Sequence, residues 1–243
     1  MMMQIQGIIA QASLNASMNM KVLDAVVQNV SNQNTVGYKT RRGDLYLTEE
    51  GGPLGYQGRI RFEQGTPQLT HRNLDVCMQG DGFFVVTQKD GKVAYTRDGQ
   101  FSRNAEGMLV NAHNDVVGSG ISLPIDYESL LIDEEGVISA RPDKESPYKT
   151  IGKLPVVRFQ NPEGLHFVGQ GKWVPSQDSG SPELIQPGSV HKGRIRQGFL
   201  ERSNVNMFHQ VDEILRLNAG VISNIKMIRF MDEIFRQATN LRQ

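Results

Sequence analysis

Both ends of the chain carry apolar side chains at alternating spacings of three and four residues, within residues 5–31 and 207–241. A mean step of about 3.5 residues keeps such side chains in a narrow line along one side of an α-helix, which is the pattern that two wrapped helices need. We therefore predict a long helix at each end and a coiled-coil-like pairing between them. The two stripes are Ile5, Ile9, Ala12, Ala16, Asn19, Leu23, Val26 and Val30, and Ile214, Leu217, Val221, Ile225, Ile228, Met231, Phe235, Ala238 and Leu241.

The same spacing also fits two ordinary amphipathic helices that pack on the rest of the protein, because core-facing helices and coiled-coil seams differ only slightly in period. The length of the first stripe favours the coiled coil, since Ile5 to Val30 would form a helix about 39 Å long at about 1.5 Å per residue. Asn19 is a polar residue within this stripe. We expect it to control the register of the pairing.

The middle of the chain consists of short apolar runs between turn residues, which predicts β-strands. F-F-V-V-T, Q-K-D-G-K and V-A-Y-T follow one another at residues 83–96. They predict a β-hairpin, because Asp90 and Gly91 suit a tight turn that needs positive φ. Turns recurring at roughly 8 to 12 residues are typical of a small barrel or a sandwich. The further expected turns are Asp98-Gly99, Glu106-Gly107 and Glu135-Gly136.

These patterns predict a mixed α and β fold with terminal helices around a mainly antiparallel β middle domain. The helices are expected in residues 1–34 and 206–243, and the β-rich domain in 75–194. Residues 35–74 and 195–205 are expected to form an extended connecting region, because glycine and proline punctuate the first of these segments.

Charge and composition exclude several classes of partner. Lys and Arg number 26 and Asp and Glu number 26, so no net field attracts the chain to nucleic acid. The single cysteine, Cys77, excludes an internal disulfide and is expected to be a small buried hydrophobe. The sequence contains no unbroken stretch of about 18 apolar residues, so it predicts no transmembrane segment. The amino terminus lacks the basic flank of a Sec signal peptide, which by itself predicts a cytoplasmic protein.

The sequence contains no pattern that predicts an active site, a metal site or a cofactor. Gly80 to Phe84 read G-D-G-F-F, which lacks the third glycine and the following helix of a phosphate-binding loop, so we expect a turn. A pair of acids from distant parts of the chain remains an alternative, in a secreted β-rich cell-wall enzyme or binding module. The histidines lie at isolated positions without metal-ligand spacing: His71, His113, His166, His191 and His209.

Three separate segments resemble the bacterial flagellar axial protein family, whose members build the rod and the hook. The first is L-D-A-V-V-Q-N-V-S-N-Q-N-T-V-G-Y-K at Leu23 to Lys39. The second runs from Gly80 to Val110 and contains G-D-G-F-F-V-V, Y-T-R-D-G-Q-F and G-M-L-V. The third is G-F-L-E-R-S-N-V-N at Gly198 to Asn206, just before the last helix. The order and spacing of the segments agree with the family, so the resemblance covers essentially the whole chain.

The resemblance implies a building block without enzymatic activity. Such a subunit polymerises helically with itself and with other rod and hook axial proteins into a drive shaft that transmits torque. The resemblance also implies passage through the flagellar export apparatus without a cleaved signal peptide, and a place in the periplasmic rod of the basal body. The terminal helices would form an inner domain that lines the axial tube, with the β domain outside it.

Within the family, the shortness of the chain favours a rod subunit over a typical hook subunit, which carries an additional outer domain. Proximal and distal rod both stay open, and a hook subunit or hook–rod adaptor is the alternative. The chain departs from the family pattern in its last helix, where it reads L-N-A-G-V-I-S-N. Gly220 lies inside this helix at a cost of about 1 kcal/mol relative to Ala.

The motif residues are expected to act either as local determinants of the fold or as contacts between subunits. Asn29 and Asn32 lie one turn apart near a helix end, where their amides can bond free carbonyls or a neighbouring subunit. Gly37 can take positive φ, and Ser203 and Asn204 are expected to cap or brace the turn into the last helix. The residues that carry the resemblance are Asn29, Asn32, Thr35, Gly37, Tyr38, Lys39, Gly80, Gly82, Phe83, Phe84, Tyr95, Thr96, Arg97, Gly99, Gly107, Glu201, Ser203, Asn204 and Val205.

Overall fold

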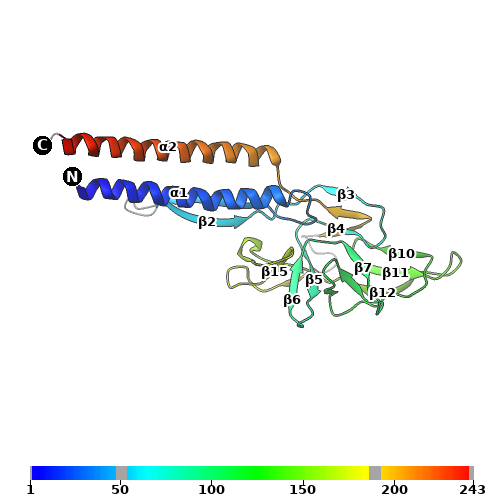
Figure 1. The fold of residues 1–243 in the computed structure, drawn as a ribbon. Coiled ribbons are helices and arrows are strands. Elements are labelled where there is room, and N and C mark those ends of the chain that lie inside the picture. Colours follow the sequence, from blue (N-terminus) through cyan, green and yellow to red (C-terminus); the bar gives the residue numbers. More distant parts are fainter. Residues whose placement is uncertain (1, 48–53, 186–192, 241–243) are drawn as a thin grey trace. The chain divides into compact units, whose positions relative to one another are not determined.

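The computed structural model describes residues 2–47, 54–185 and 193–240 (Figure 1), and the chain divides into two compact units. The first, called the helical unit below, contains Met1–Asn32, Thr40–Arg61 and Val205–Gln243. The second, called the β unit, contains Gln33–Lys39 and Phe62–Asn204. The chain therefore passes between the two units four times.

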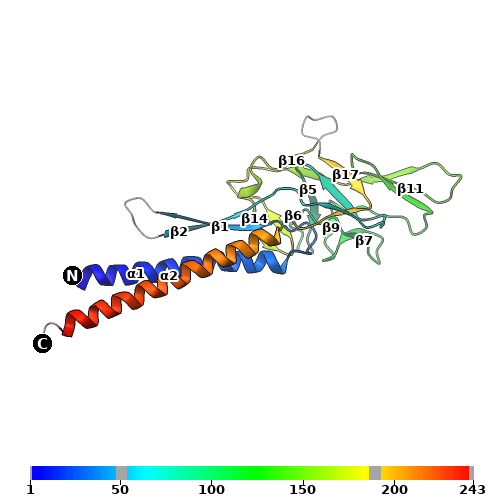
Figure 2. The ribbon, with the colours of Figure 1, turned by 90° about the horizontal axis from the view of Figure 1, so that it is seen from above.

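The helical unit consists of two long helices and one hairpin. Helix α1 (Met2–Ser31) and helix α2 (Met207–Asn240) run antiparallel beside each other, and they cross in the view of Figure 2. Strands β1 (Arg41–Leu47) and β2 (Leu54–Ile60) pair antiparallel, and both contact α1. Neither of the two described α-helices combines the length and the apolar character that crossing a membrane requires.

One small hydrophobic cluster holds the helical unit together. Its buried members are Val22 and Val26 of α1 and Leu217 of α2, and Leu45 and Tyr56 of the hairpin pack against them. The hairpin lies close to α1 because β1 contains a glycine: a Cβ on Gly43 would lie 3.1 Å from Val22 Cγ2 and 2.6 Å from the Tyr56 ring. Leu23, Val30 and Ile214 complete the cluster.

The prediction that the terminal helices pair as a coiled coil is wrong. The hairpin covers part of the apolar side of α1, so the helices share a local cluster with it instead of a continuous seam. Further along α2 the residues of the stripe are less well covered, and Ile225 is 46 % exposed. A period of 3.5 and one of 3.6 differ by only about 20° per heptad, so the spacing could not distinguish a seam from a face packed on a hairpin.

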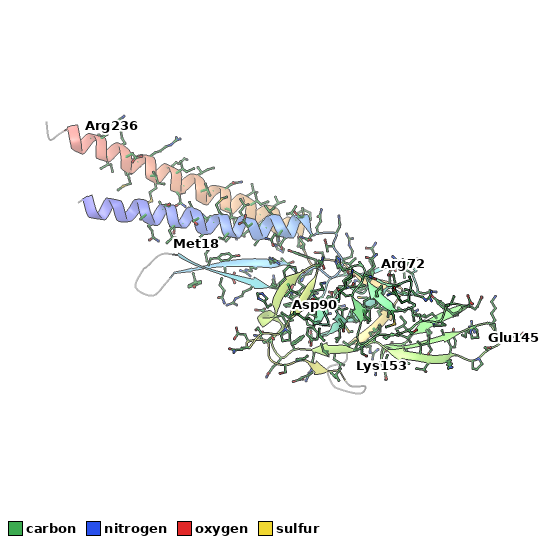
Figure 3. The ribbon with its side chains drawn as sticks, turned by 60° about the horizontal axis from the view of Figure 1, so that its bottom comes forward. Met18, Arg72, Asp90, Glu145, Lys153 and Arg236 are labelled. Atoms are coloured by element: carbon green, nitrogen blue, oxygen red, sulfur yellow. The ribbon has the colours of Figure 1, made fainter. Side chains whose placement is uncertain are left out.

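The remaining stripe residues vary in exposure. Ala12 is buried, whereas Ala16, Asn19, Val221, Ile228 and Met231 are half-buried. Arg236, labelled near the end of α2 in Figure 3, pairs with Glu233 of the same helix at 2.6 Å. The side chains of Ile5, Ile9, Phe235 and Ala238, and the whole of Leu241, lie outside the part of the chain that the structure describes.

All described strand pairs of the β unit are antiparallel, as expected for the middle of the chain. Its strands are β3 (Pro67–Leu69), β4 (Val76–Gln79), β5 (Phe83–Thr87), β6 (Val93–Thr96), β7 (Phe101–Arg103), β8 (Leu109–Asn111), β9 (Val116–Val117), β10 (Ser129–Ile132), β11 (Val137–Arg141), β12 (Lys149–Lys153), β13 (Val156–Arg158), β14 (His166–Gly169), β15 (Lys172–Val174), β16 (Glu183–Leu184), β17 (Arg194–Gln197) and β18 (Phe199–Glu201).

The largest sheet has nine strands with the path β14-β15-β6-β5-β9-β8-β7, from which β13 and β16 branch. The path is open at both ends, so this sheet does not close into a barrel. The predicted hairpin is confirmed as β5 and β6, with Val86 opposite Ala94 and Gly91 at a φ of +81°. A second sheet has the order β10-β11-β12, and the pairs β17-β4 and β18-β3 complete the unit.

Two buried clusters fill the β unit. The larger contains Phe84, Phe101 and Ile138, and the smaller is mainly aromatic. In the aromatic cluster Phe83 contacts Phe159 and Trp173 edge to face, with ring centroids 5.6 and 5.9 Å apart. Figure 3 shows side chains crowded over the strands of the β unit, whereas Glu145 lies in the exposed loop that joins β11 to β12.

Candidate functional site

The three segments that carry the family resemblance meet in the β unit at a buried group of charges. Lys39 belongs to the first segment, Arg97 to the second and Glu201 to the third. Their side chains are 0 %, 2 % and 0 % exposed. Lys39 Nζ lies 2.5 Å from Glu201 Oε1, and Arg97 Nη1 lies 3.5 Å from Glu201 Oε2. We call these three residues the junction cluster.

Backbone groups from neighbouring segments complete the surroundings of Lys39 and Glu201. Lys39 Nζ also donates a hydrogen bond to the Glu63 carbonyl at 2.8 Å. The Gly65 amide donates to Glu201 Oε1 at 2.8 Å, and the Gly37 amide donates to the Glu201 carbonyl at 2.8 Å. Glu201 therefore binds two different segments through its side chain and its backbone.

Arg97 connects the cluster to the large sheet. It follows β6, donates through Nη1 to the Gly80 carbonyl at 2.9 Å, and lies over the Phe83 ring at 5.1 Å from the centroid. Within the described part of the chain, Arg97 Nε and Glu201 Oε2 have no hydrogen-bond partner. The Arg97–Glu201 contact is thus electrostatic rather than a second hydrogen-bonded pair.

The electrostatics of the cluster are dominated by burial. Loss of hydration lowers the pKa of Lys39, and the nearby Glu201 carboxylate opposes this effect. Burial also lowers the pKa of Arg97, and the carboxylates of Glu201 and Asp81 oppose it. Buried ion groups are weak stabilisers compared with apolar side chains, but removing one partner is costly because a charge then stays buried without compensation.

Glycines allow the backbone segments around the cluster to approach closely. Gly37 has a φ of +66°, and a Cβ there would lie 2.7 Å from the carbonyl carbon of Arg97. A Cβ on Gly65 would lie 1.8 Å from the Arg202 carbonyl oxygen. Gly99 likewise allows a close approach to β4, since a Cβ on Gly99 would lie 1.8 Å from the Val76 carbonyl oxygen. Gly99 is therefore required for close approach rather than for positive φ.

Asn29 performs a similar joining role in the helical unit. Its side chain is buried, and Nδ2 donates to the Arg41 carbonyl at 2.7 Å and to Gln210 Oε1 at 2.9 Å. Its Oδ1 accepts a hydrogen bond from the Arg41 amide at 2.8 Å. One amide thus joins α1, β1 and α2, all within the same unit.

Three further asparagines lie at or near the helix ends in the sequence. Asn32 Nδ2 donates to the Gln28 carbonyl at 2.8 Å just after α1 ends. Asn204 Nδ2 donates to the Glu63 carbonyl at 2.9 Å. The cap of α2 is Asn206, whose Oδ1 accepts from the Phe208 amide at 3.0 Å. The sequence reasoning missed Asn206, although an asparagine directly before an apolar-periodic segment is a recognised start signal.

The other motif residues lie in the two core clusters, at the end of β6, between strands, or in the connecting segments. Phe83 and Tyr95 lie in the aromatic cluster and Phe84 lies in the larger core cluster. Thr96 Oγ1 donates to the Gly171 carbonyl at 2.9 Å. Gly80, Gly82 and Gly107 have positive φ in the connections between strands. Thr35, Tyr38, Ser203 and Val205 lie in the segments that lead into or out of the β unit.

The described side chains show no arrangement suited to metal binding: no group of three or more His, Cys, Asp or Glu residues has the required geometry. His191 lies outside the described residues.

A cavity of about 420 Å³ opens on the β unit beside Phe62, Phe83 and Phe159. Its charged rim includes Arg158 and Glu183, which pair with each other at 2.7 Å. The side chains around this cavity therefore offer apolar packing contacts and an ion pair.

Comparison with known proteins gives a match inside the β unit. Residues 77–140 match the family model described as the flagellar hook protein FlgE/F/G D1 domain. This range contains Arg97 of the junction cluster, whereas Lys39 and Glu201 lie on either side of it. The matched range also contains β5 to β10 and most of β11.

Similar curated proteins match over nearly their whole length. The flagellar basal-body rod protein FlgG of Borreliella burgdorferi is 32 % identical over 246 residues, covering 91 % of this chain and 93 % of the relative. FlgG of Bacillus subtilis is 32 % identical over 248 residues, with coverages of 91 % and 93 %. The rod protein FlgF of Buchnera aphidicola subsp. Schizaphis graminum is 27 % identical over 242 residues, covering 94 % and 95 %.

Proposed function

Because the chain belongs to the flagellar basal-body rod protein family, we propose that it polymerises helically into the rod of the bacterial flagellum. It is a structural subunit of the basal body. Its partners are copies of itself and other axial proteins of the rod and hook. We further propose that it passes through the flagellar export apparatus without a cleaved signal peptide and transmits torque by rigid packing rather than by catalysis.

The outer side of α2 is the observation that best supports polymerisation. On the side that faces α1, Leu217 is buried and Ile214 is half-buried. Apolar residues also occupy the opposite side, where steps of three, four and seven residues place them on one line. A helix that is apolar on two sides needs a second partner. The residues of this outer face are Phe208, 86 % exposed, Val211, 50 %, Leu215, 62 %, and Ile222, 53 %.

The terminal segments supply the proposed inner part of the rod. We propose that residues 1–34 and 206–243 line the axial channel, that 75–194 form the outer part, and that 35–74 and 195–205 connect them. The stripe residues then contribute to contacts within and between subunits. The full-length relatives are rod proteins, which favours the rod over a hook subunit or adaptor. No observation favours a cell-wall enzyme.

The test replaces the most exposed residues of the outer face, as Phe208→Ser with Leu215→Ser, in a strain whose own copy has been deleted. The deletion strain is expected to stop before the hook. The variant monomer should fold as the wild type does, because neither side chain is buried, but it should build no rods. Leu184→Ser, at a position 69 % exposed in the β unit, is the control and should restore motility. Normal motility of the outer-face variant would rule out this surface as a polymer contact.

A further inference from the structure

The β unit connects to the rest of the chain through only three segments. The chain enters and leaves at residues 32/33, 39/40, 61/62 and 204/205. Residues 33–39 therefore begin and end at a crossing, the second segment begins at Phe62, and the third ends at Asn204. Any force that reaches the β unit along the chain must pass through these segments.

Hydrogen bonds inside the β unit tie the first segment to each of the others. Lys39 Nζ bonds Glu201 Oε1 and the Glu63 carbonyl, at 2.5 and 2.8 Å. The Gly37 amide bonds the Glu201 carbonyl at 2.8 Å. The Arg202 side chain adds a contact at the start of this segment, where Nη2 donates to Asn34 Oδ1 at 3.3 Å.

The second and third segments are also joined directly. The Gly65 amide donates to Glu201 Oε1 at 2.8 Å, and the Arg202 amide donates to the Thr66 carbonyl at 3.0 Å. Asn204 Nδ2 donates to the Glu63 carbonyl at 2.9 Å. All three pairings among the segments are therefore made, and Glu201 or its neighbours take part in the two that involve the third segment.

Arg97 extends the connection into the nine-stranded sheet, since it follows β6 and faces Glu201 from within the β unit. We propose that the junction cluster is a mechanical clamp. It holds the three connecting segments and the sheet as one rigid element, so that torque is carried by all four chain crossings together. This inference rests on the proposed function, because the load that the clamp carries is the torque of a rotating rod.

The chemistry of the cluster suits this role better than an apolar core would. Apolar contacts are non-directional and tolerate sliding, whereas hydrogen-bonded charges fix the positions of their partners. Burial makes the separation of Lys39 from Glu201 costly, since the Lys39 ammonium would be left without its counter-charge. The close approach at Gly37 and Gly65 leaves little space for the segments to shift.

The first part of the test measures amide hydrogen exchange in the purified full-length chain. Glu201→Gln should raise the exchange rates of the Gly37, Gly65 and Arg202 amides, because local opening frees them. The factor of increase at these amides should be roughly tenfold or more larger than the factor at the amides of β5 and β6. Ile138→Ala, at a fully buried core position, is the control. When the two variants are compared at equal distance from their urea midpoints, Ile138→Ala should raise exchange without preference for these amides. Equal exchange patterns in the two variants would overturn the clamp.

The second part measures rotation under increasing viscous load in cells that build rods from variant and wild-type chains together. Rods containing Glu201→Gln should stop or break at lower load than rods containing Ile138→Ala. Equal load limits would overturn the clamp and leave the proposed function standing. Absence of the wild-type chain from purified rods would instead overturn the proposed function, and with it the clamp, whatever the exchange data show.

Discussion

At the residue scale, the contact between Lys39 and Glu201 joins positions 162 residues apart in the sequence. Both side chains are fully buried, and each bonds the backbone of the segment that begins at Phe62. A lysine and a glutamate that are common on protein surfaces thus become specific determinants of the fold. Loss of either side chain would leave its buried partners without a hydrogen bond or a counter-charge.

Glu201→Gln should lower the free energy of unfolding of the β unit by about 3 to 5 kcal/mol, because the Lys39 ammonium stays buried without a counter-charge. Urea unfolding followed by Trp173 fluorescence would measure the change, since Trp173 lies in the aromatic cluster. The double replacement Lys39→Met with Glu201→Leu should recover only part of the loss, because Lys39 no longer stays as a buried charge whereas Arg97 still lacks the Glu201 carboxylate. An unchanged midpoint for the single variant would contradict the assigned ion pair.

Cys77 gives a pH-dependent prediction. Burial raises the pKa of its thiol from the ordinary 9.0 to about 11. The unfolded chain therefore loses the thiol proton at lower pH than the folded chain, and the contribution of Cys77 to stability falls as pH rises from about 9 towards about 11.

Between about pH 8 and 10.5, the unfolding free energy of the wild type should fall by about 2 kcal/mol relative to Cys77→Ala, at 1.36 kcal/mol per pKa unit. Burial lowers the pKa of Lys39, which acts in the opposite direction, but both proteins share that contribution. Chemical denaturation across this pH range measures the difference. Parallel curves for the two proteins would show that the thiol titrates normally.

At the scale of elements, local patterns could be predicted and long-range partners could not. The hairpin of β5 and β6 follows from neighbouring residues, because Asp90 and Gly91 specify the turn between two apolar runs. The end of α1 at Ser31 and the start of α2 at Met207 lie within a few residues of the predicted positions for the same reason. The pairing of α1 with a hairpin was missed, since nothing in the stripe reveals that Tyr56 and Leu45 would cover it.

The junction cluster shows the same limit for the site. Lys39, Arg97 and Glu201 were singled out by resemblance, one segment at a time. Their meeting depends on how the strands between them pair, which no spacing along the chain encodes. The assignment of the stripe and motif residues to subunit contacts stays a prediction, because it concerns neighbours in an assembly.

Gly220 offers a test of the helical unit as an element. A Cβ there would lie 3.5 Å from Asn19 Nδ2, which is ordinary van der Waals contact. Gly220→Ala should therefore stabilise α2 by up to about 1 kcal/mol through reduced backbone entropy in the unfolded chain.

Helicity measured by circular dichroism during heating should show a raised midpoint for Gly220→Ala. Gly65→Ala is the matched contrast, because its Cβ would lie 1.8 Å from the Arg202 carbonyl oxygen and the backbone must move. Destabilisation by Gly220→Ala would mean that Asn19 and Gly220 pack more closely than described.

At the scale of the whole molecule, the chain combines a well-packed β unit with helices whose apolar surface is only partly covered. Phe208, Leu215 and Ile222 remain exposed although the residues on the opposite side of α2 pack inside the unit. In a family of rod proteins, this imbalance fits a subunit that completes its packing by assembly. Stability of the monomer and stability of the rod are then separate quantities.

The central claim is that this chain is a rod subunit that assembles through the outer face of α2. Electron cryomicroscopy of basal bodies from a strain that carries only this copy tests it most directly. The account predicts rod density that fits this chain, with Phe208, Val211, Leu215 and Ile222 covered by neighbouring subunits. A rod built without the chain, or one in which this face of α2 remains open to solvent, would contradict it.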